Sequence, residues 1–183
     1  MGNHRYMGQI FSIGYGNLEF AEFIDRIKNE DIQYLIDVRT SPYSKYKPEF
    51  SQSDLKYGLR SNNISYVYMG DNLGGRPHSL DCYTEGKVDY NKTRRQNFFR
   101  DGIKRLINSQ NGGYKVCLFC SESHPSQCHR CKLIGEDLST WHIDVTHIMP
   151  DGSKLSQKEV MALVTGGQSD MFGNNLTSRK KYK

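Results

Sequence analysis

Residues 9–38, QIFSIGYGNLEFAEFIDRIKNEDIQYLIDV, decide the fold of this chain. The apolar run at residues 9–13 is typical of a short buried strand, and it ends in a turn that begins at Gly14. From Leu18 onward, apolar residues recur at the spacing of one helix face, which predicts a helix. A second apolar run at residues 34–38 predicts another strand. A strand, a helix and a strand joined by a right-handed crossover make the two strands parallel, as direct neighbours or near neighbours.

The same alternation continues along the rest of the chain. Further strands are predicted at residues 65–69, 114–119 and 143–148, and helices at residues 51–60, 91–111, 128–138 and 156–164. Residues 70–90 form a long polar loop, which in a compact domain is usually functional. We therefore predict one Rossmann-like α/β domain over residues 1–165, with a mostly parallel five-stranded sheet flanked by helices. A flexible basic tail should follow over residues 166–183.

The length and composition exclude several classes of protein. A chain of 183 residues can bury a core without metal or disulfide staples. It has no run of about 18 apolar residues, so no membrane span is expected. Its polar N-terminus lacks the apolar stretch of a signal peptide, so we expect a cytoplasmic location. The net charge is +5, but four basic residues lie in the last five positions, so the body is nearly neutral.

Candidate site residues follow the predicted strands. In open parallel sheets, ligands bind beyond the carboxyl ends of the strands. The segments at these ends are Gly14-Tyr15, Asp37-Val38-Arg39 with Ser41, Gly74-Gly75-Arg76, Cys120-Ser121-Glu122 and Cys128-His129-Arg130. Each segment also has a structural explanation, such as a glycine turn, a hinge, an ion pair or a small buried thiol. Together they combine acid, base, thiol and imidazole groups at one edge.

The five cysteines are Cys82, Cys117, Cys120, Cys128 and Cys131. An odd number in a chain of this size favours reduced thiols, a metal or chemistry over a disulfide framework. The last four have the paired spacing of a four-thiolate zinc site. Cys117 and Cys120, however, lie three residues apart on one predicted strand and should face opposite sides of the sheet. We predict no cofactor, with a zinc ion, including a mixed site of Cys120, Cys128 and His129, as the alternative.

The non-metal interpretation gives the thiols a chemical role. Cys128 lies at a predicted helix N-terminus, where the helix dipole favours a thiolate. His129 and Arg130 beside it add a hydrogen-bond donor and a positive charge. Asp37 and Glu122 have the chemistry of a general acid or base.

These segments carry a family resemblance. The order Ser12-Ile13-Gly14-Tyr15, Leu35 to Arg39 with Ser41-Pro42, Leu73-Gly74-Gly75, Cys120-Ser121-Glu122 and Cys128-His129-Arg130 resembles the family named domain of unknown function 488. The resemblance extends from about Ile10 to Ile148. It implies an α/β fold and a shared pocket at these residues, and it implies no settled activity. Members are sometimes labelled DNA repair proteins. Cys117 and Cys131 lie outside the family pattern, which weakens the four-cysteine zinc site further.

The tail contains a second resemblance. Gln168, Asp170, Met171 and Phe172 are similar to the short peptide by which bacterial replication and repair proteins bind the sliding clamp, whereas Ser169 stands where Leu is commoner. An extended segment with two adjacent apolar side chains suits a groove on a partner. The alternative is that Met171 and Phe172 fold back onto the domain.

We expect an enzyme that acts on a nucleotide, nucleoside or nucleic-acid base, in connection with DNA repair, as a hydrolase or transferase. The expected catalytic residues are Asp37, Glu122, Cys120 and Cys128. The expected substrate-binding residues are Gly14, Tyr15, Arg39, Ser41, Gly74, Gly75, Arg76, His129 and Arg130. A basic helix face at Arg94, Arg95, Arg100, Lys104 and Arg105 either contacts phosphates or is simply solvated. The alternatives are a non-catalytic nucleotide or nucleic-acid binding module and a zinc-stabilised adaptor.

Overall fold

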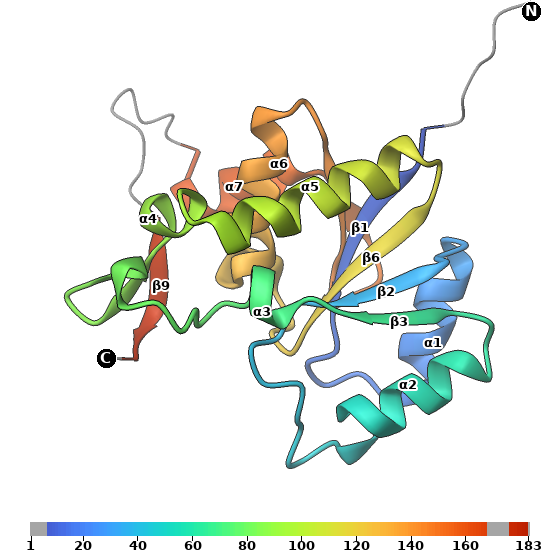
Figure 1. The fold of residues 1–183 in the computed structure, drawn as a ribbon. Helices are drawn as coiled ribbons and strands as arrows, with labels where there is room; N and C mark the ends of the chain where they lie inside the picture. The colour runs from blue at the N-terminus through green and yellow to red at the C-terminus, as the bar shows by residue number, and fades with distance from the viewer. Residues whose placement is uncertain (1–6, 168–175, 183) are drawn as a thin grey trace, which may run out of the picture.

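The computed structural model describes residues 7–167 and 176–182, and it is built around a six-stranded sheet with the order β3-β2-β6-β1-β7-β8 (Figure 1). Five strands are parallel: β1 (Gln9–Gly14), β2 (Tyr34–Asp37), β3 (Ser65–Tyr68), β6 (Lys115–Cys120) and β7 (Val145–Ile148). The predicted α/β fold with its mostly parallel sheet is confirmed. β8 (Lys154–Leu155) adds a short antiparallel edge that the sequence did not predict.

The strand order decides which segments meet. β6 lies between β1 and β2, so the first two strands are near neighbours and not a pair. In register, Gly14 is opposite Cys120, and Asp37 is opposite Phe119. The carboxyl ends of β1, β2 and β6 therefore lie side by side in the middle of the sheet.

Helices cover both faces of the sheet (Figure 1). Phe23, Ile24 and Ile27 of α1 (Phe20–Asn29) and Leu55 and Leu59 of α2 (Gln52–Arg60) share one core cluster with Cys117. α5 (Asn97–Asn111), η4 (Arg130–Gly135, a π-helix) and α6 (Glu136–Thr140) pack on the other face. The remaining helices are η1 (Pro48–Phe50), α3 (Gly70–Leu73), η2 (Leu80–Cys82), α4 (Tyr90–Arg94), η3 (Pro125–Gln127) and α7 (Gln157–Thr165).

The helix predicted over residues 91–111 is divided in the structure. α4 ends at Arg94 and α5 begins at Asn97, because an extended Gln96 interrupts the helical backbone. The helix predicted over residues 156–164 is confirmed as α7. It begins with a capping box in which the Ser156 hydroxyl accepts a bond from the Glu159 N–H and the Glu159 carboxylate accepts one from the Ser156 N–H.

A second, three-stranded sheet lies beside the domain and consists of β4 (Tyr83–Thr84), β5 (Lys87–Asp89) and β9 (Thr177–Lys181) in that order. The sequence assigned residues 177–181 to a tail outside the domain. In the structure they pair antiparallel with β5, from Lys87 opposite Lys181 to Asp89 opposite Thr177. This pairing brings basic residues of the C-terminal segment back onto the body. No helix within the described ranges is long and apolar enough to cross a membrane.

Candidate functional site

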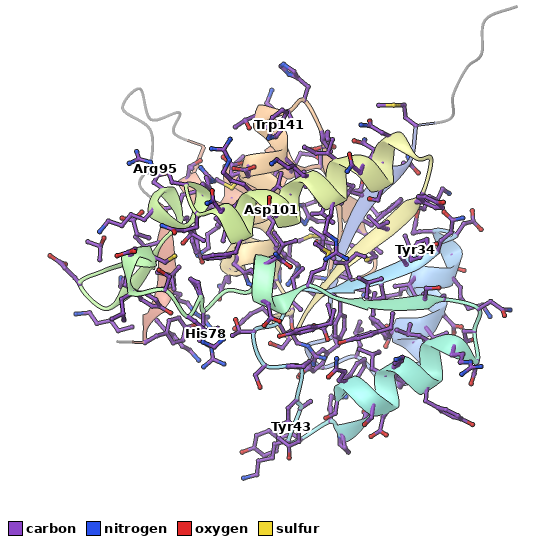
Figure 2. All side chains as sticks on the ribbon, in the orientation of Figure 1. Tyr34, Tyr43, His78, Arg95, Asp101 and Trp141 are labelled. Carbon is purple, nitrogen blue, oxygen red and sulfur yellow. The ribbon has the colours of Figure 1, made fainter. Side chains whose placement is uncertain are left out.

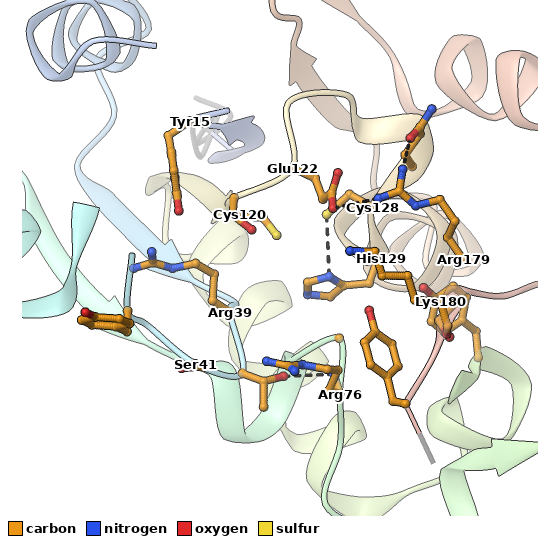
Figure 3. Close-up of a pocket in the computed structure, with 18 residues that line it drawn as sticks. Tyr15, Arg39, Ser41, Arg76, Cys120, Glu122, Cys128, His129, Arg179 and Lys180 are labelled. Atoms are coloured by element: carbon orange, nitrogen blue, oxygen red, sulfur yellow. Dashed lines mark hydrogen bonds and ion pairs between the residues drawn. The ribbon is translucent and has the colours of Figure 1, made fainter. Parts of the chain in front are cut away.

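A pocket of about 310 Å³ opens at the carboxyl ends of β1, β2 and β6 (Figure 3). Cys120, Cys128 and His129 group at its centre, and Arg39, Arg76 and Arg179 lie around them. The pocket is lined by five groups of segments, four of which come from the domain body. These are Tyr15 after β1, Arg39 to Ser41 and Tyr43 after β2, Gly75, Arg76 and Tyr90 from the connection after β3, and Cys120 to Glu122 with Gln127 to His129. β9 and the residue after it supply Ser178, Arg179, Lys180 and Tyr182.

Cys128 and His129 form the chemical centre of the pocket. The Sγ of Cys128 lies 3.6 Å from the Nδ1 of His129, and the Nε2 of His129 lies 3.0 Å from the carbonyl oxygen of Val38. A carbonyl can only accept a hydrogen bond, so Nε2 carries a proton and donates it. In the neutral imidazole the Nδ1 lone pair therefore faces the Cys128 thiol. This arrangement lets His129 take up or return a proton at the sulfur.

Cys120 lies on the other side of the Cys128 sulfur. The Sγ atoms of Cys120 and Cys128 and a ring nitrogen of His129 all lie within 4.8 Å of one another. Burial acts to raise the pKa of Cys128. A hydrogen bond with Cys120, the charge of Arg130 and hydrogen bonds with Arg130 outweigh it, so the pKa falls to about 6. The same hydrogen bond, together with burial, raises the pKa of Cys120 to about 12. Cys128 is the thiolate at neutral pH, and Cys120 is the donor.

Arg130 is placed in the protein interior and not in the pocket, where the sequence predicted it. Its side chain is fully buried. Its Nη1 and Nη2 donate to the carbonyl oxygens of Glu122 and Ser123 at 2.7 and 2.9 Å, and its Nε lies 3.3 Å from the Ser12 hydroxyl. Among the described residues it pairs with no carboxylate, and its charge acts to lower the pKa of Cys128. Arg130 therefore supports the site from behind and orders the loop that carries Glu122.

A chain of hydrogen bonds continues from Arg130 through the interior. The Ser12 hydroxyl, which accepts from Arg130, donates to the Nδ1 of His147 at 2.6 Å, because Nε2 must donate to the Gln157 amide oxygen and the ring is neutral. The Nε2 of His147 donates to Gln157 at 2.8 Å, and Gln157 donates to Glu136 at 2.8 Å. Burial lowers the pKa of His147 to about 4, so its imidazole is neutral. The chain fixes the position of Arg130 relative to the pocket.

Asp37 is also buried beneath the pocket and does not line it. Its two carboxylate oxygens accept bonds from the Nε and Nη2 of Arg39 at 2.9 and 2.7 Å, and from the Tyr66 hydroxyl at 2.8 Å. Burial and this carboxylate raise the pKa of Tyr66. The role of general acid or base that the sequence suggested for Asp37 does not fit this position. Its contacts instead hold Arg39.

Arg39 itself lines the pocket and is 5 % exposed. Its guanidinium forms an ion pair with Asp37. It also lies over the ring of Phe119, whose centroid is 4.8 Å from the Arg39 Cζ. The Nη1 of Arg39 is buried and has no hydrogen-bond partner. A buried hydrogen-bond donor that lacks an acceptor lowers the stability of the folded protein. Arg39 therefore keeps one donor that no protein group in the described residues uses.

The predicted glycines explain how closely these segments approach. A Cβ at Gly75 would lie 2.8 Å from the Nδ1 of His129, so the bare backbone is needed where this segment covers the imidazole. A Cβ at Gly14 would lie 1.7 Å from the Glu122 carbonyl oxygen. Gly74 packs against Gly70 and Thr40 and does not reach the pocket. Gly75 is thus a pocket residue, whereas Gly14 and Gly74 shape the backbone behind it.

The mouth of the pocket is cationic and aromatic. Arg76, Arg179 and Lys180 line it, and Glu122 is paired with Arg179 at 3.3 Å. The Tyr43 side chain projects outward from the loop after β2 (Figure 2) and is 69 % exposed. The Tyr182 ring faces Arg76, whose Cζ lies 5.5 Å from the ring centroid. Ser41 and Tyr15 line the pocket as predicted, and the Tyr15 ring stacks on Phe50 at 4.3 Å.

Sequence reasoning missed the pocket residues that the small sheet contributes, namely Ser178, Arg179, Lys180 and Tyr182, and also missed Tyr90, Gln127 and Tyr43. β9 is rich in basic residues and carries no apolar alternation, so no strand signal existed there. Tyr43 lies in the loop after a predicted strand end, and that placement was the available signal. The predicted partner-binding residues Gln168, Asp170, Met171 and Phe172 lie outside the described residues.

The four-cysteine zinc site is excluded by geometry. Cys117 packs in the core on the opposite face of the sheet from Cys120, and Cys131 packs against Met161 with a sulfur–sulfur distance of 3.7 Å. Cys120, Cys128 and His129 form the one group of three donors in the described part of the chain that is close enough to hold a metal ion. The bond from His129 to Val38 is of the kind that orients a ligating histidine.

Comparison with known proteins gives one match. The family model described as "Domain of unknown function DUF488" matches residues 19–135. This range is shorter than the expected resemblance from Ile10 to Ile148, and it contains both the Asp37 to Arg39 segment and the Cys120 to Arg130 segment. No curated protein and no solved structure matches the chain.

Proposed function

This chain belongs to the family described as Domain of unknown function DUF488, and from the residues of its pocket we propose that it is an enzyme that acts on a nucleotide, nucleoside or nucleic-acid base. The observation that carries the proposal is that Cys128, His129 and Arg39, whose Nη1 has no hydrogen-bond partner, all line one pocket. A nucleophile and an oxyanion-binding group in one cavity fit hydrolysis or group transfer on an anionic substrate.

The charge of the pocket favours a phosphate-bearing substrate. Arg76, Arg179 and Lys180 line the mouth of the pocket. Of these three cations, Arg179 forms an ion pair with Glu122. Guanidinium groups bind phosphate oxygens in a bidentate manner. The charge of Arg39 is balanced by Asp37, so Arg39 contributes a fixed donor and little net charge.

The aromatic residues of the pocket suit a planar base. Tyr43 and Tyr182 are exposed at the mouth, and Tyr90 is buried deeper, so rings are available at more than one depth. Stacking on tyrosine is tolerant of base identity and is a common way to hold a nucleobase. We therefore place the base against these rings and the phosphate toward the cationic residues.

In the proposed reaction, the Cys128 thiol passes its proton to the Nδ1 of His129, and the sulfur attacks the electrophilic carbon or phosphorus of the substrate. The bond to the leaving group breaks, a covalent intermediate forms, and His129 gives the Nδ1 proton to the leaving group. Neutral His129 then takes a proton from water or from a second acceptor hydroxyl, which displaces Cys128 and releases the product. Cys120 donates a hydrogen bond to the thiolate, and Glu122 stands at the mouth as a second acid or base. Arg130 stabilises the thiolate, and Asp37 positions Arg39.

The experiment that tests the proposal compares wild-type protein with Cys128→Ser and with Cys131→Ser as a matched buried control. Each protein is incubated with nucleosides, nucleoside phosphates and short single-stranded oligonucleotides, and products are identified by mass spectrometry. We expect turnover by the wild type and the control, and loss of turnover with retained binding in Cys128→Ser. Binding of a probe that is equal in all three proteins, without product from any probe, would identify a binding module instead of an enzyme.

The proposed connection with DNA repair rests on the tail peptide, since the pocket itself does not select a pathway. If the resemblance reflects function, a synthetic peptide of residues 167–174 binds a bacterial sliding clamp and the same peptide with Met171 and Phe172 replaced by Ala does not. Equal affinity of the two peptides, or no binding by either, would remove the clamp from the proposal.

A further inference from the structure

Two of the five thiols differ from the others in their surroundings. Cys120 and Cys128 line the pocket, are 5 % and 2 % exposed, and have sulfur atoms within 4.8 Å of each other. Cys82, Cys117 and Cys131 are fully buried and do not line it. A small molecule that enters the pocket therefore meets one specific pair of sulfurs.

The two thiols also differ in their contacts. The Cys128 sulfur lies 3.6 Å from the Nδ1 of His129, which can take up the thiol proton, and the Cys120 sulfur lies within 4.8 Å of the Cys128 sulfur and of a ring nitrogen of His129. A reactive thiol with a second thiol beside it is the arrangement in which an oxidised first sulfur is resolved by its neighbour.

We propose that Cys120 is the resolving thiol of Cys128, so that a hydroperoxide entering the pocket converts the two residues into a Cys120–Cys128 disulfide. This modification does not rest on the nucleotide proposal, because no nucleotide takes part in it. It shares with that proposal only the accessibility of the Cys128 sulfur.

The chemistry balances in two steps. The Cys128 thiolate attacks one oxygen of the hydroperoxide, the O–O bond breaks, Cys128 becomes a sulfenic acid, and the other oxygen leaves as an alkoxide that takes up a proton. The Cys120 sulfur then attacks the Cys128 sulfur, the S–O bond breaks, and the oxygen leaves as water with the Cys120 proton. The two thiols are oxidised by two electrons, and the hydroperoxide is reduced to an alcohol and water.

The position of Cys128 allows the closure. It follows η3 at the end of the loop that connects β6 to η4, whereas Cys120 is the last residue of β6. A disulfide needs the sulfurs about 2 Å apart, so its formation requires the Cys128 side chain or its loop to move toward Cys120. The disulfide would remove the nucleophile from the pocket, and its reduction would restore it.

The experiment uses the full chain, reduced and freed of metal by a chelator, and treats it with a small molar excess of hydrogen peroxide. We expect the protein to lose two of its five thiols, and dithiothreitol to restore both. Peptide mapping after blocking the remaining thiols should find Cys120 joined to Cys128. This measurement needs no variant, so it does not depend on a substitution being tolerated.

Two variants separate the roles of the sulfurs. Cys120→Ser should form no disulfide and should accumulate a sulfenic acid at Cys128 that dimedone captures, whereas the matched Cys131→Ser variant should form the disulfide as the wild type does. An unchanged thiol count in the wild type, a linkage to any other cysteine, or a sulfinic acid at Cys128 beside a free Cys120 would each overturn the proposal. None of these outcomes bears on whether the protein acts on a nucleotide.

Discussion

Cys128 and His129 are adjacent in sequence, and their side chains face each other across 3.6 Å, with the imidazole fixed from behind by the Val38 carbonyl. Adjacent side chains rarely meet productively in a regular helix. Here they meet because Cys128 is extended and His129 is the first residue with helical backbone angles, directly before the π-helix η4. The site therefore depends on the place where η4 begins.

The first prediction concerns the ionisation of Cys128. Since its pKa is lowered to about 6, iodoacetamide should alkylate it with a rate that is half-maximal near pH 6 and constant above about pH 7. Cys120→Ala should move the midpoint upward by about one pH unit or more, because it removes the hydrogen bond that stabilises the thiolate. Cys131→Ala should leave the midpoint in place. The measurement is peptide mass spectrometry of quenched samples, and a midpoint near the ordinary thiol value in the wild type would contradict the prediction.

The second prediction concerns Asp37. Replacing it with Asn leaves the buried Arg39 guanidinium without its anion, so we expect the free energy of unfolding to fall by about 3 kcal/mol or more. Tyr66→Phe removes one hydrogen bond to the same carboxylate and should cost about 1 kcal/mol. The measurement is urea denaturation followed by circular dichroism.

The matched control for Asp37 is Asp101→Asn. The Asp101 side chain is 65 % exposed and lies 3.7 Å from Lys104, so its replacement should change the stability by less than about 0.5 kcal/mol. Asp37 and Asp101 variants of equal stability would show that the Asp37–Arg39 pair does not hold this part of the fold.

The third prediction concerns acid stability. The folded-state pKa of His147 is lowered to about 4, below the ordinary value of 6.5, so between these values the unfolded chain binds the proton and the folded chain does not. Stability should therefore decrease as the pH falls from about 6.5 to about 4, by about 3 kcal/mol from this residue. His147→Gln should lose stability at neutral pH and show a flatter decrease over this range. A parallel decrease in both proteins would assign the effect to other groups.

The strands and the sheet edge that carry the pocket could be predicted from the sequence because both rest on local signals. Apolar runs marked the five parallel strands, and the rule for parallel sheets placed Tyr15, Arg39 and Cys120 at one edge, where the structure has them. The prediction that Cys117 and Cys120 face opposite sides followed from the strand period alone and is confirmed by their separate cores.

The depth of each side chain could not be predicted, because it depends on partners distant in sequence. Asp37 and Arg130 looked like pocket groups, yet Asp37 is enclosed by Arg39 and Tyr66, and Arg130 reaches back to Ser12 on β1. β9 was missed for a related reason. Its pairing with β5 spans about half the chain, and its sequence lacks the alternation of apolar and polar residues that predicts a strand. Cationic residues such as Arg179 therefore reached the pocket without a sequence signal.

The fourth prediction decides between the thiolate and a metal ion at Cys120, Cys128 and His129. These three donors lie within 4.8 Å of one another and would leave an open position toward the pocket, as in catalytic zinc sites. The thiolate interpretation expects elemental analysis of protein purified without chelator to find far less than one zinc per chain. It also expects a chelator to leave the unfolding temperature unchanged. The opposite result would be one zinc per chain in the wild type, in Cys117→Ser and in Cys131→Ser, and no zinc in Cys120→Ser and in Cys128→Ser. That result would show that Cys128 is a metal ligand and not a nucleophile. The two outcomes can be separated because the sulfur atoms of Cys117 and Cys131 do not belong to the group of three donors. A zinc loss caused only by unfolding would therefore appear in all four variants.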